Sequence, residues 1–183
     1  CNSRGVKPVS PEQLPVLPCR WVAALPQHSP EQYLHALGDT VYLFSRGHAV
    51  HKMKIPDYPS AAVQWSPPLV IMPSTGPGFS VTFFRRWFFL IPGCTHQQRT
   101  PVYRSLRRSD GSLGQWEQAG SLPFGISHHA LASGKKGLFL LGGRSLKGPL
   151  STVCHFSIDR KGNLCRPRYC LALPQPVGPA RCE

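Results

Sequence analysis

Apolar and polar positions along the chain alternate in strand-sized stretches. Near the C-terminal end, the alternating run ALA (130–132) leads into the turn sequence GKKG (134–137), and the apolar run LFLL (138–141) follows before a Gly-Gly pair. Short alternation, a glycine-bounded turn and a continuous apolar run predict a β-hairpin whose second strand is buried. The following segments STVCHFSID (151–159), RKGNL (160–164) and the stretch up to Pro174 predict a third strand, a turn and a fourth strand.

This four-strand pattern recurs along the chain. The segment 83–93 aligns with 133–143 at an offset of 50 residues, and 102–123 aligns with 153–174 at an offset of 51. An earlier copy, LHALGDTVYLFS at 34–45, precedes VTFFRRWFFLIP by 47 residues. A period of about 40 to 50 residues with several short strands in each unit is typical of β-propellers and related β-arrays.

Each unit resembles a blade of a kelch-type β-propeller. In that family the second strand ends in Gly-Gly, the third strand leads into a polar hairpin and a Trp lies on the outer strand. The matching features here are Gly142-Gly143, SDGSL (109–113), Trp65 and Trp116. The resemblance covers about residues 21–174, and it implies an all-β, propeller-like array of about three four-stranded blades.

The expected organisation follows from these copies. The blades cover about 17–73, 74–123 and 124–174, between a flexible tether at 1–16 and a tail at 175–183. A four-stranded sheet has two faces to bury, and about four blades are the usual minimum for a closed propeller. We therefore expect completion by a partner or a second chain. The alternatives are a dimer of three-bladed halves, an open array packed on another protein, or a distorted small barrel.

The cysteines indicate the cellular compartment in which the protein is located. The chain opens with Cys1 and a polar stretch rich in Pro and Ser, which resembles a mature bacterial lipoprotein. That resemblance implies lipid attachment at Cys1 and an extracytoplasmic, membrane-anchored location, either periplasmic or on the cell surface. Six further cysteines, an even number, are typical of disulfides in an oxidising compartment. The candidates are Cys19, Cys94, Cys154, Cys165, Cys170 and Cys182.

The charge of the chain is strongly basic. Lys and Arg number 21 against 8 Asp and Glu, giving a net charge of +13, which favours acidic partners or anionic surfaces. We expect the turn residues to form a basic rim for lipid phosphates or an acidic partner, with plain solvated turn charges as the alternative. The rim candidates are Arg85, Arg86, Arg104, Arg107, Arg108, Lys135 and Lys136. Nucleic acid is not expected as a partner, because the aromatic residues fall at core-like positions rather than among the charges.

No grouping of residues in the sequence predicts catalysis. His128 and His129 are adjacent on an expected strand, so they point to opposite faces, one into the core and one to solvent. The Cys165-x4-Cys170 spacing is not that of a common zinc site, and eight acids leave little room for paired carboxylates. We expect no metal, no cofactor and no enzyme activity.

Together these features predict a non-catalytic binding or scaffold lipoprotein. Its expected role is that of an accessory subunit in a larger bacterial membrane or envelope complex, bound to other protein subunits. One alternative is a glycan-binding or glycan-processing propeller module. Another is a structural component of an extracellular appendage or a phage particle.

Overall fold

The computed structural model describes residues 25–26, 29–55, 64–96, 98–170 and 172–174. The regular structure in these residues is entirely β, in three four-stranded antiparallel sheets and one two-stranded ribbon. None of the described segments is a helix of the length and apolar character needed to cross a membrane. The expected tether (1–16) and tail (175–183), with Cys1, Cys19 and Cys182, lie outside the described residues.

Each sheet is built from strands that are close in sequence. The first sheet has the order β1 (Gln32–Leu37), β2 (Thr40–Ser45), β3 (Ala49–Lys54), β4 (Val70–Ile71). The second has the order β5 (Gly76–Phe84), β6 (Trp87–Gly93), β7 (Thr100–Leu106), β8 (Glu117–Leu122). The third has the order β9 (Ala130–Gly134), β10 (Gly137–Leu141), β13 (Val153–Ile158), β14 (Leu164–Tyr169). The ribbon pairs β11 (Arg144–Ser145) with β12 (Gly148–Pro149).

The repeated apolar segments occupy the same place in each sheet. Val41–Phe44, Phe88–Ile91 and Leu138–Leu141 all lie in the second strand, paired on both sides. A strand with a neighbour on either side has no free edge, which suits a continuous apolar run. The prediction of an all-β chain made of four-stranded antiparallel sheets is therefore confirmed.

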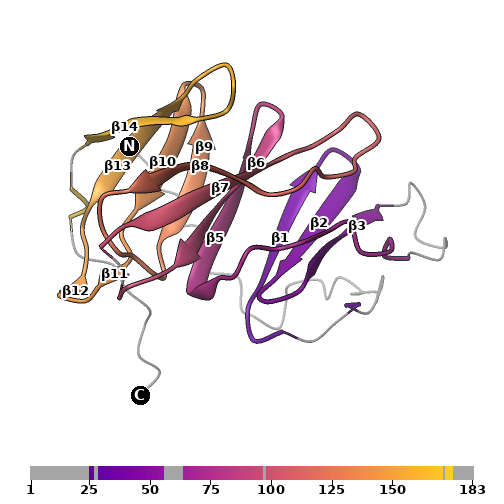
Figure 1. Cartoon of the computed structure of the whole chain (residues 1–183), viewed down its shortest axis with the longest axis horizontal. Coiled ribbons are helices and arrows are strands. Elements are labelled where there is room, and N and C mark those ends of the chain that lie inside the picture. Colours follow the sequence, from indigo (N-terminus) through magenta and orange to yellow (C-terminus); the bar gives the residue numbers. More distant parts are fainter. Residues whose placement is uncertain (1–24, 27–28, 56–63, 97, 171, 175–183) are drawn as a thin grey trace, which may run out of the picture.

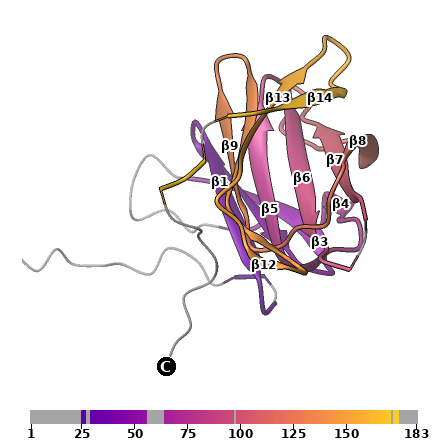
Figure 2. The ribbon, with the colours of Figure 1, turned by 90° about the vertical axis from the view of Figure 1, so that its left-hand side faces the viewer.

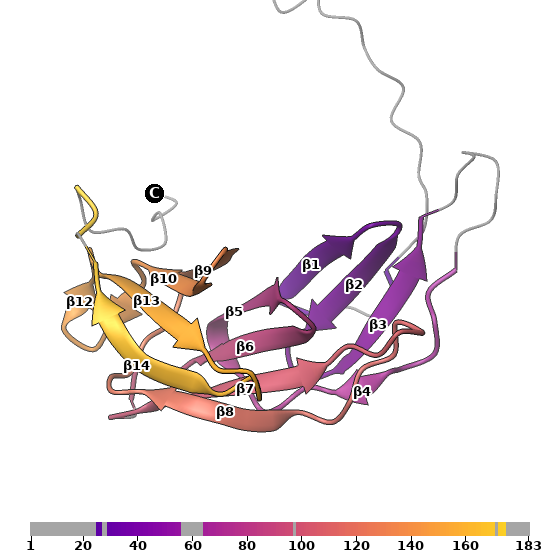
Figure 3. The same cartoon turned by 90° about the horizontal axis from the view of Figure 1, so that it is seen from above.

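The three sheets stand side by side in an open arc (Figure 3). Their first strands lie along the inner side of the arc, where β5 contacts both β1 and β9. The fourth strands lie along the outer side, where β8 contacts β14. The described strands form no closed ring, so the two end sheets have only one neighbouring sheet each.

The core lies in two layers, one on each face of the second sheet. Phe88 and Leu90 point toward the first sheet, where they pack with Tyr42 and Phe44. Phe89 and Ile91 point toward the third sheet and join the other cluster. Alternate residues of a strand face opposite sides, so β6, which is buried along its whole length, supplies both layers.

One partly buried contact ties the inner strands of the first two sheets together. The Gly78 amide donates to both carboxylate oxygens of Glu31, at 2.8 and 3.0 Å. Glu31 also lies 3.7 Å from Arg46, measured from Oε2 to Nε. A charged acceptor makes this a stronger bond than a neutral pair would, and it fixes β5 beside the start of β1.

The face of the third sheet that points away from the second sheet carries no further sheet among the described residues. We call it the open face; Figure 2 shows the third sheet in front of the second. It is formed by the side chains that alternate away from the core, namely Ala130, Ala132, Phe139, Leu141, Val153, His155 and Arg168. Phe139 and His155 are only partly buried there. Five of these seven residues are apolar, and one of them is aromatic.

Candidate binding clefts between the sheets

A hairpin of the second sheet docks on the first sheet. The Lys52 ammonium on β3 donates to the Asp110 carbonyl oxygen at 2.7 Å, and the Tyr42 hydroxyl donates to the Gly111 carbonyl oxygen at 3.0 Å. Arg107 Nε in turn donates to the Tyr42 hydroxyl oxygen at 2.8 Å. These contacts border a cleft of about 670 Å³ between the two sheets.

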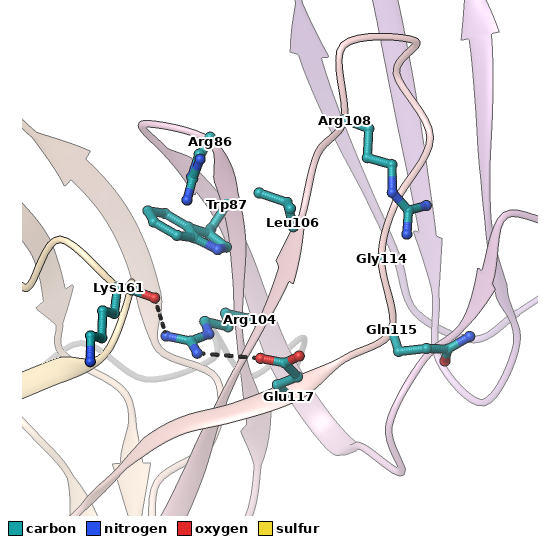
Figure 4. Close-up of a pocket in the computed structure, with 9 residues that line it drawn as sticks. All are labelled: Arg86, Trp87, Arg104, Leu106, Arg108, Gly114, Gln115, Glu117 and Lys161. Carbon is teal, nitrogen blue, oxygen red and sulfur yellow. Dashed lines mark hydrogen bonds and ion pairs between the residues drawn. The ribbon is translucent and has the colours of Figure 1, made fainter.

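An equivalent hairpin of the third sheet docks on the second sheet (Figure 4). Arg104 Nη1 on β7 donates to the Lys161 carbonyl oxygen at 2.6 Å and to Asn163 Oδ1 at 2.8 Å. Its Nη2 donates to Glu117 Oε2 at 3.3 Å. The cleft beside these contacts has a volume of about 310 Å³.

This second cleft is basic and aromatic. Arg86, Arg104, Arg108 and Lys161 line it, against the single carboxylate of Glu117. The Arg86 guanidinium lies 4.7 Å from the centre of the Trp87 ring, a cation–π contact. Guanidinium groups suit carboxylate or phosphate oxygens, whereas the lining includes no His, Cys or paired carboxylates. The cleft can therefore hold an anion, but it offers no acid–base pair.

The two docking hairpins share one internal design. The Ser112 amide donates to Asp110 Oδ1 at 2.9 Å, and the Asn163 amide donates to Asp159 Oδ1 at 2.8 Å. These backbone bonds, together with side-chain bonds from Ser112 and Asn163, hold the pKa of both carboxyl groups below its usual value. Each hairpin thus carries a charged Asp beside its docking carbonyl.

Glycine is required where each hairpin touches the preceding sheet. Gly111 and Gly162 have φ angles of 76° and 86°, which disfavour other residues. A Cβ on Gly111 would lie 3.2 Å from both the Tyr42 hydroxyl and the Lys52 ammonium. A Cβ on Gly162 would lie 2.8 Å from the Trp87 ring. Sequence analysis noted these glycines as turn residues but missed that they contact a neighbouring sheet.

A third cleft is open to solvent on the open face. Phe139 and His155 stack there with their ring centres 4.7 Å apart. We call this cleft, with a volume of about 510 Å³, the Phe139 hollow. The remaining residues that line it are Lys135, Lys136, Arg168, Tyr169 and Cys170.

The residues of the expected basic rim fall into two groups. Arg85-Arg86 lie in the β5–β6 turn and Lys135-Lys136 in the β9–β10 turn, at the same end of the sheets (Figure 1). We call this the basic end. Arg108 lies beside them in the β7–β8 connection, where it contacts Ser112 and the Leu113 carbonyl.

Arg104 and Arg107 were expected to be free charges on a rim, but each has a partner in a neighbouring sheet. Arg104 lies on β7 and reaches the third sheet, and Arg107 reaches Tyr42 of the first sheet. Both guanidinium groups are therefore held in contacts between sheets. Their partners lie about 60 residues away along the chain, so the local sequence could not reveal them.

The expected disulfides are not found among the described cysteines. Cys94, Cys154, Cys165 and Cys170 are all free thiols. Cys154 is buried in the layer between the second and third sheets, whereas Cys165 and Cys170 are exposed at the edge strand β14 and its end. Burial, with a smaller contribution from Cys170, raises the pKa of the Cys154 thiol to about 11. An even cysteine count carries no information on these positions.

The two adjacent histidines differ in burial as expected, but they precede β9 instead of lying on a strand, and His128 has a φ of 51°. His129 is buried and His128 is exposed. Burial, with a smaller effect of the neighbouring His128, lowers the pKa of His129 to about 3. Neither ring nitrogen of His129 has a hydrogen-bond partner in the described structure. No three His, Cys, Asp or Glu side chains come together as a metal site within the described residues.

Comparison with known proteins gives no family assignment. No protein-family model matches the chain. A search of curated proteins also finds no significant match.

Proposed function

We propose that this chain is a non-catalytic binding and scaffold protein that joins a partner protein through the open face of its third sheet. The observation that carries the proposal is a contrast between sheets. The second sheet has both faces buried, with Phe89 and Ile91 at most 1 % exposed. At the equivalent positions of the third sheet, Phe139 and Leu141 remain partly exposed. An apolar face of this kind is stabilised when another surface covers it.

The arrangement of strands supports a propeller-like interpretation of the array. In each sheet the chain runs from an inner first strand to an outer fourth strand, apart from the β11–β12 ribbon in the third. Neighbouring sheets pack face to face, as propeller blades do. Three such blades in an open arc leave a position for a further sheet beside the third. The proposed protein is thus an incomplete propeller that depends on a partner.

The chemistry of the clefts supports binding over catalysis. All three clefts combine cationic side chains with an aromatic ring. A glycan-processing module would need a pair of carboxylates, one of them an acid with a raised pKa. The Arg104 cleft offers only Glu117. The first cleft holds Asp39 and Asp110, but hydrogen bonds lower the pKa of both. Cations and rings together suit an acidic protein surface.

The proposed cellular setting is the outer side of a bacterial membrane, in an accessory subunit held by a lipid on Cys1. This part depends on a residue outside the described structure. Intact mass spectrometry of protein purified from its native membrane tests it directly. A mass increase that maps to Cys1 is expected, and an unmodified Cys1 would remove the membrane anchor from the proposal.

Site-specific photocrosslinking tests the binding role. A photoreactive amino acid replaces Tyr169, which is 65 % exposed beside the Phe139 hollow, in the full chain in its native cells. Leu146, which is 67 % exposed in the β11–β12 turn, is the matched control. We expect one discrete crosslinked species at Tyr169, lost when Phe139→Ala is added, and none at Leu146. Equal crosslinking at both positions, or none at Tyr169, would contradict the proposal.

A further inference from the structure

One repeated pair of residues lies at the position of each cleft, and its third-strand member lines the cleft each time. Tyr42 on β2 is opposite Lys52 on β3, and Phe89 on β6 is opposite Arg104 on β7. In the third sheet, Phe139 on β10 is opposite His155 on β13. Each pair joins an aromatic ring on the second strand to a nitrogen donor on the third strand. All three pairs face the same way along the arc, toward the next sheet or, in the third sheet, toward solvent.

At the first two pairs, the next sheet fills the position with a hairpin. Lys52 binds the carbonyl of Asp110, and Arg104 binds the carbonyl of Lys161. These two carbonyls lie 51 residues apart, the offset of the repeat, and each directly precedes a glycine with positive φ. The third-strand donor therefore binds the same kind of carbonyl twice within this molecule, and the glycine after that carbonyl lies against a ring each time, Tyr42 at the first cleft and Trp87 at the second.

The third pair has the donor and the ring but no described hairpin. Instead, the Phe139 hollow occupies that position. We propose that the hollow is a socket for a glycine-turn β-hairpin of a partner protein, presented at the end of a four-stranded sheet that covers the open face. A ring N–H of His155 donates to the carbonyl before the glycine, and the glycine lies against the Phe139 ring. This inference rests on the proposed function and specifies the chemistry of the partner.

The charge around the hollow defines the partner further. Lys135, Lys136 and Arg168 surround it, and no carboxylate is among its lining residues. At the first cleft the docked hairpin brings Asp110 close to Lys52, whose charge helps to lower the pKa of the Asp110 carboxyl group. We therefore infer that acidic residues flank the partner's hairpin, because opposite charges favour docking in the correct register.

A second copy of this chain is a poor occupant of the socket. The two described hairpins that join a third to a fourth strand through a positive-φ glycine, at Gly111 and Gly162, are already docked within the chain. The sequence between β3 and β4, residues 55–69, contains no glycine. Each copy also carries a net charge of +13, so two copies repel each other. A different protein with an acidic hairpin fits the site better.

A peptide titration tests the socket. The probe is a synthetic peptide with the sequence of residues 105–116 in which Arg107→Glu and Arg108→Glu supply the acidic flanks. It is titrated into the full chain labelled with nitrogen-15, and amide shifts are followed by NMR. We expect saturable shifts at Lys135, Phe139 and His155. The same peptide with Gly111→Val should lose the shifts, because a branched side chain at the left-handed position prevents close contact.

Protein variants distinguish peptide binding in the socket from nonspecific binding elsewhere on the chain. Phe139→Ala and His155→Leu should each weaken peptide binding about tenfold, since each removes one contact of the docked hairpin. His155→Gln keeps a donor and should retain most of the binding. Leu34→Ser removes an exposed leucine of the first sheet, 57 % exposed, and should change nothing. Shifts that map to another face, or equal binding of the Gly111→Val peptide, would overturn the proposal.

Two further outcomes distinguish the socket from the proposed function. If the peptide fails to bind while Tyr169 still gives its discrete crosslink, the open face is a binding surface but the hairpin socket is wrong. If sedimentation shows a dimer that Phe139→Asp dissolves, the face binds a second copy, and the acidic partner is wrong. If the peptide binds as expected but no crosslink forms in cells, the socket is correct and the proposed cellular role is contradicted.

Discussion

At the scale of single residues, two kinds of position affect the stability of the fold. One is a glycine whose missing Cβ allows a close contact, and the other is a buried side chain without hydrogen-bond partners. Gly162 lies against the Trp87 ring because it has no Cβ, and this contact lets the hairpin carbonyl before it reach Arg104. His129 is the opposite case, an imidazole buried with both nitrogens unpartnered in the described structure. The glycine is a requirement of docking, whereas the histidine is a cost to stability.

Substitution of Gly162 should therefore cost more than substitution of a comparable exposed glycine. Gly162→Ala forces a Cβ to 2.8 Å from Trp87, in addition to strain at a φ of 86°. Gly38→Ala, at a φ of 59° with nothing within 4 Å, has only the strain. We expect a loss of roughly 2–4 kcal/mol for Gly162→Ala and about 1 kcal/mol for Gly38→Ala. Urea unfolding of both variants measures the difference; equal losses would show that hairpin contact adds nothing.

His129 predicts how stability depends on pH. Its pKa is about 3 in the folded chain against 6.5 for a free histidine, so between these values only the unfolded chain binds the proton. Stability is therefore unaffected by His129 above pH 6.5. It falls by roughly 1.4 kcal/mol per pH unit as the pH decreases toward 3. His129→Leu should remove this slope in urea unfolding at several pH values, whereas the exposed control His48→Leu should leave it. A slope unchanged in His129→Leu would refute the assignment.

At the scale of strands and sheets, the sequence was most informative where apolar runs are continuous. The runs 88–91 and 138–141 could be assigned to buried second strands from their continuous apolar residues. Such runs suit this place because a paired strand on each side excludes water. The turns at 134–137 and 160–164 were also predictable from their glycines. Each of these features depends on local pattern alone.

Contacts between sheets could not be predicted in the same way. Arg104 was predicted as a rim charge and Lys52 had no predicted role, because their carbonyl partners belong to the hairpin of the next sheet. A usable signal did exist, in that Arg104 and His155 occupy matching places at the repeat offset of 51 residues. Loop length obscures the first copy, whose offset at the second strand is 47 residues. The cysteine prediction failed for a related reason, since a count does not say which thiols meet.

The repeat allows a matched comparison of a covered and an open sheet face. Phe89 and Phe139 occupy equivalent places on β6 and β10, but only Phe89 is covered by a further sheet. Phe89→Ala should lower the free energy of unfolding by about 3–5 kcal/mol because it leaves a cavity. Phe139→Ala should cost roughly 1 kcal/mol in the isolated chain. Chemical denaturation of the two variants provides the measurement. Equal costs would mean that the open face is already covered in the isolated chain.

At the scale of the whole molecule, the basic end adjoins the Phe139 hollow, because Lys135 and Lys136 belong to both. The turns at the basic end carry Arg85, Arg86, Lys135 and Lys136 side by side. The opposite end holds the β11–β12 ribbon with Arg144 and Lys147. A chain tethered by lipid gains membrane affinity from basic residues near an anionic surface, about 1 kcal/mol for each. Under the proposed membrane anchoring, we therefore expect the basic end to face the lipid.

The orientation can be tested with vesicles and two matched double variants. The full chain should bind phosphatidylglycerol vesicles more tightly than phosphatidylcholine vesicles, and salt should weaken the binding. Arg85→Gln with Arg86→Gln removes two charges at the basic end and should weaken binding roughly 30-fold. Arg144→Gln with Lys147→Gln removes the same charge at the opposite end of the sheets. If the basic end faces the lipid, this pair lies more than a Debye length from the membrane surface. The second double variant should therefore have little effect. Equal weakening by the two variants would mean that net charge alone attracts the chain to the membrane. In that case the turns that align at one end of the arc have no special role in orienting it.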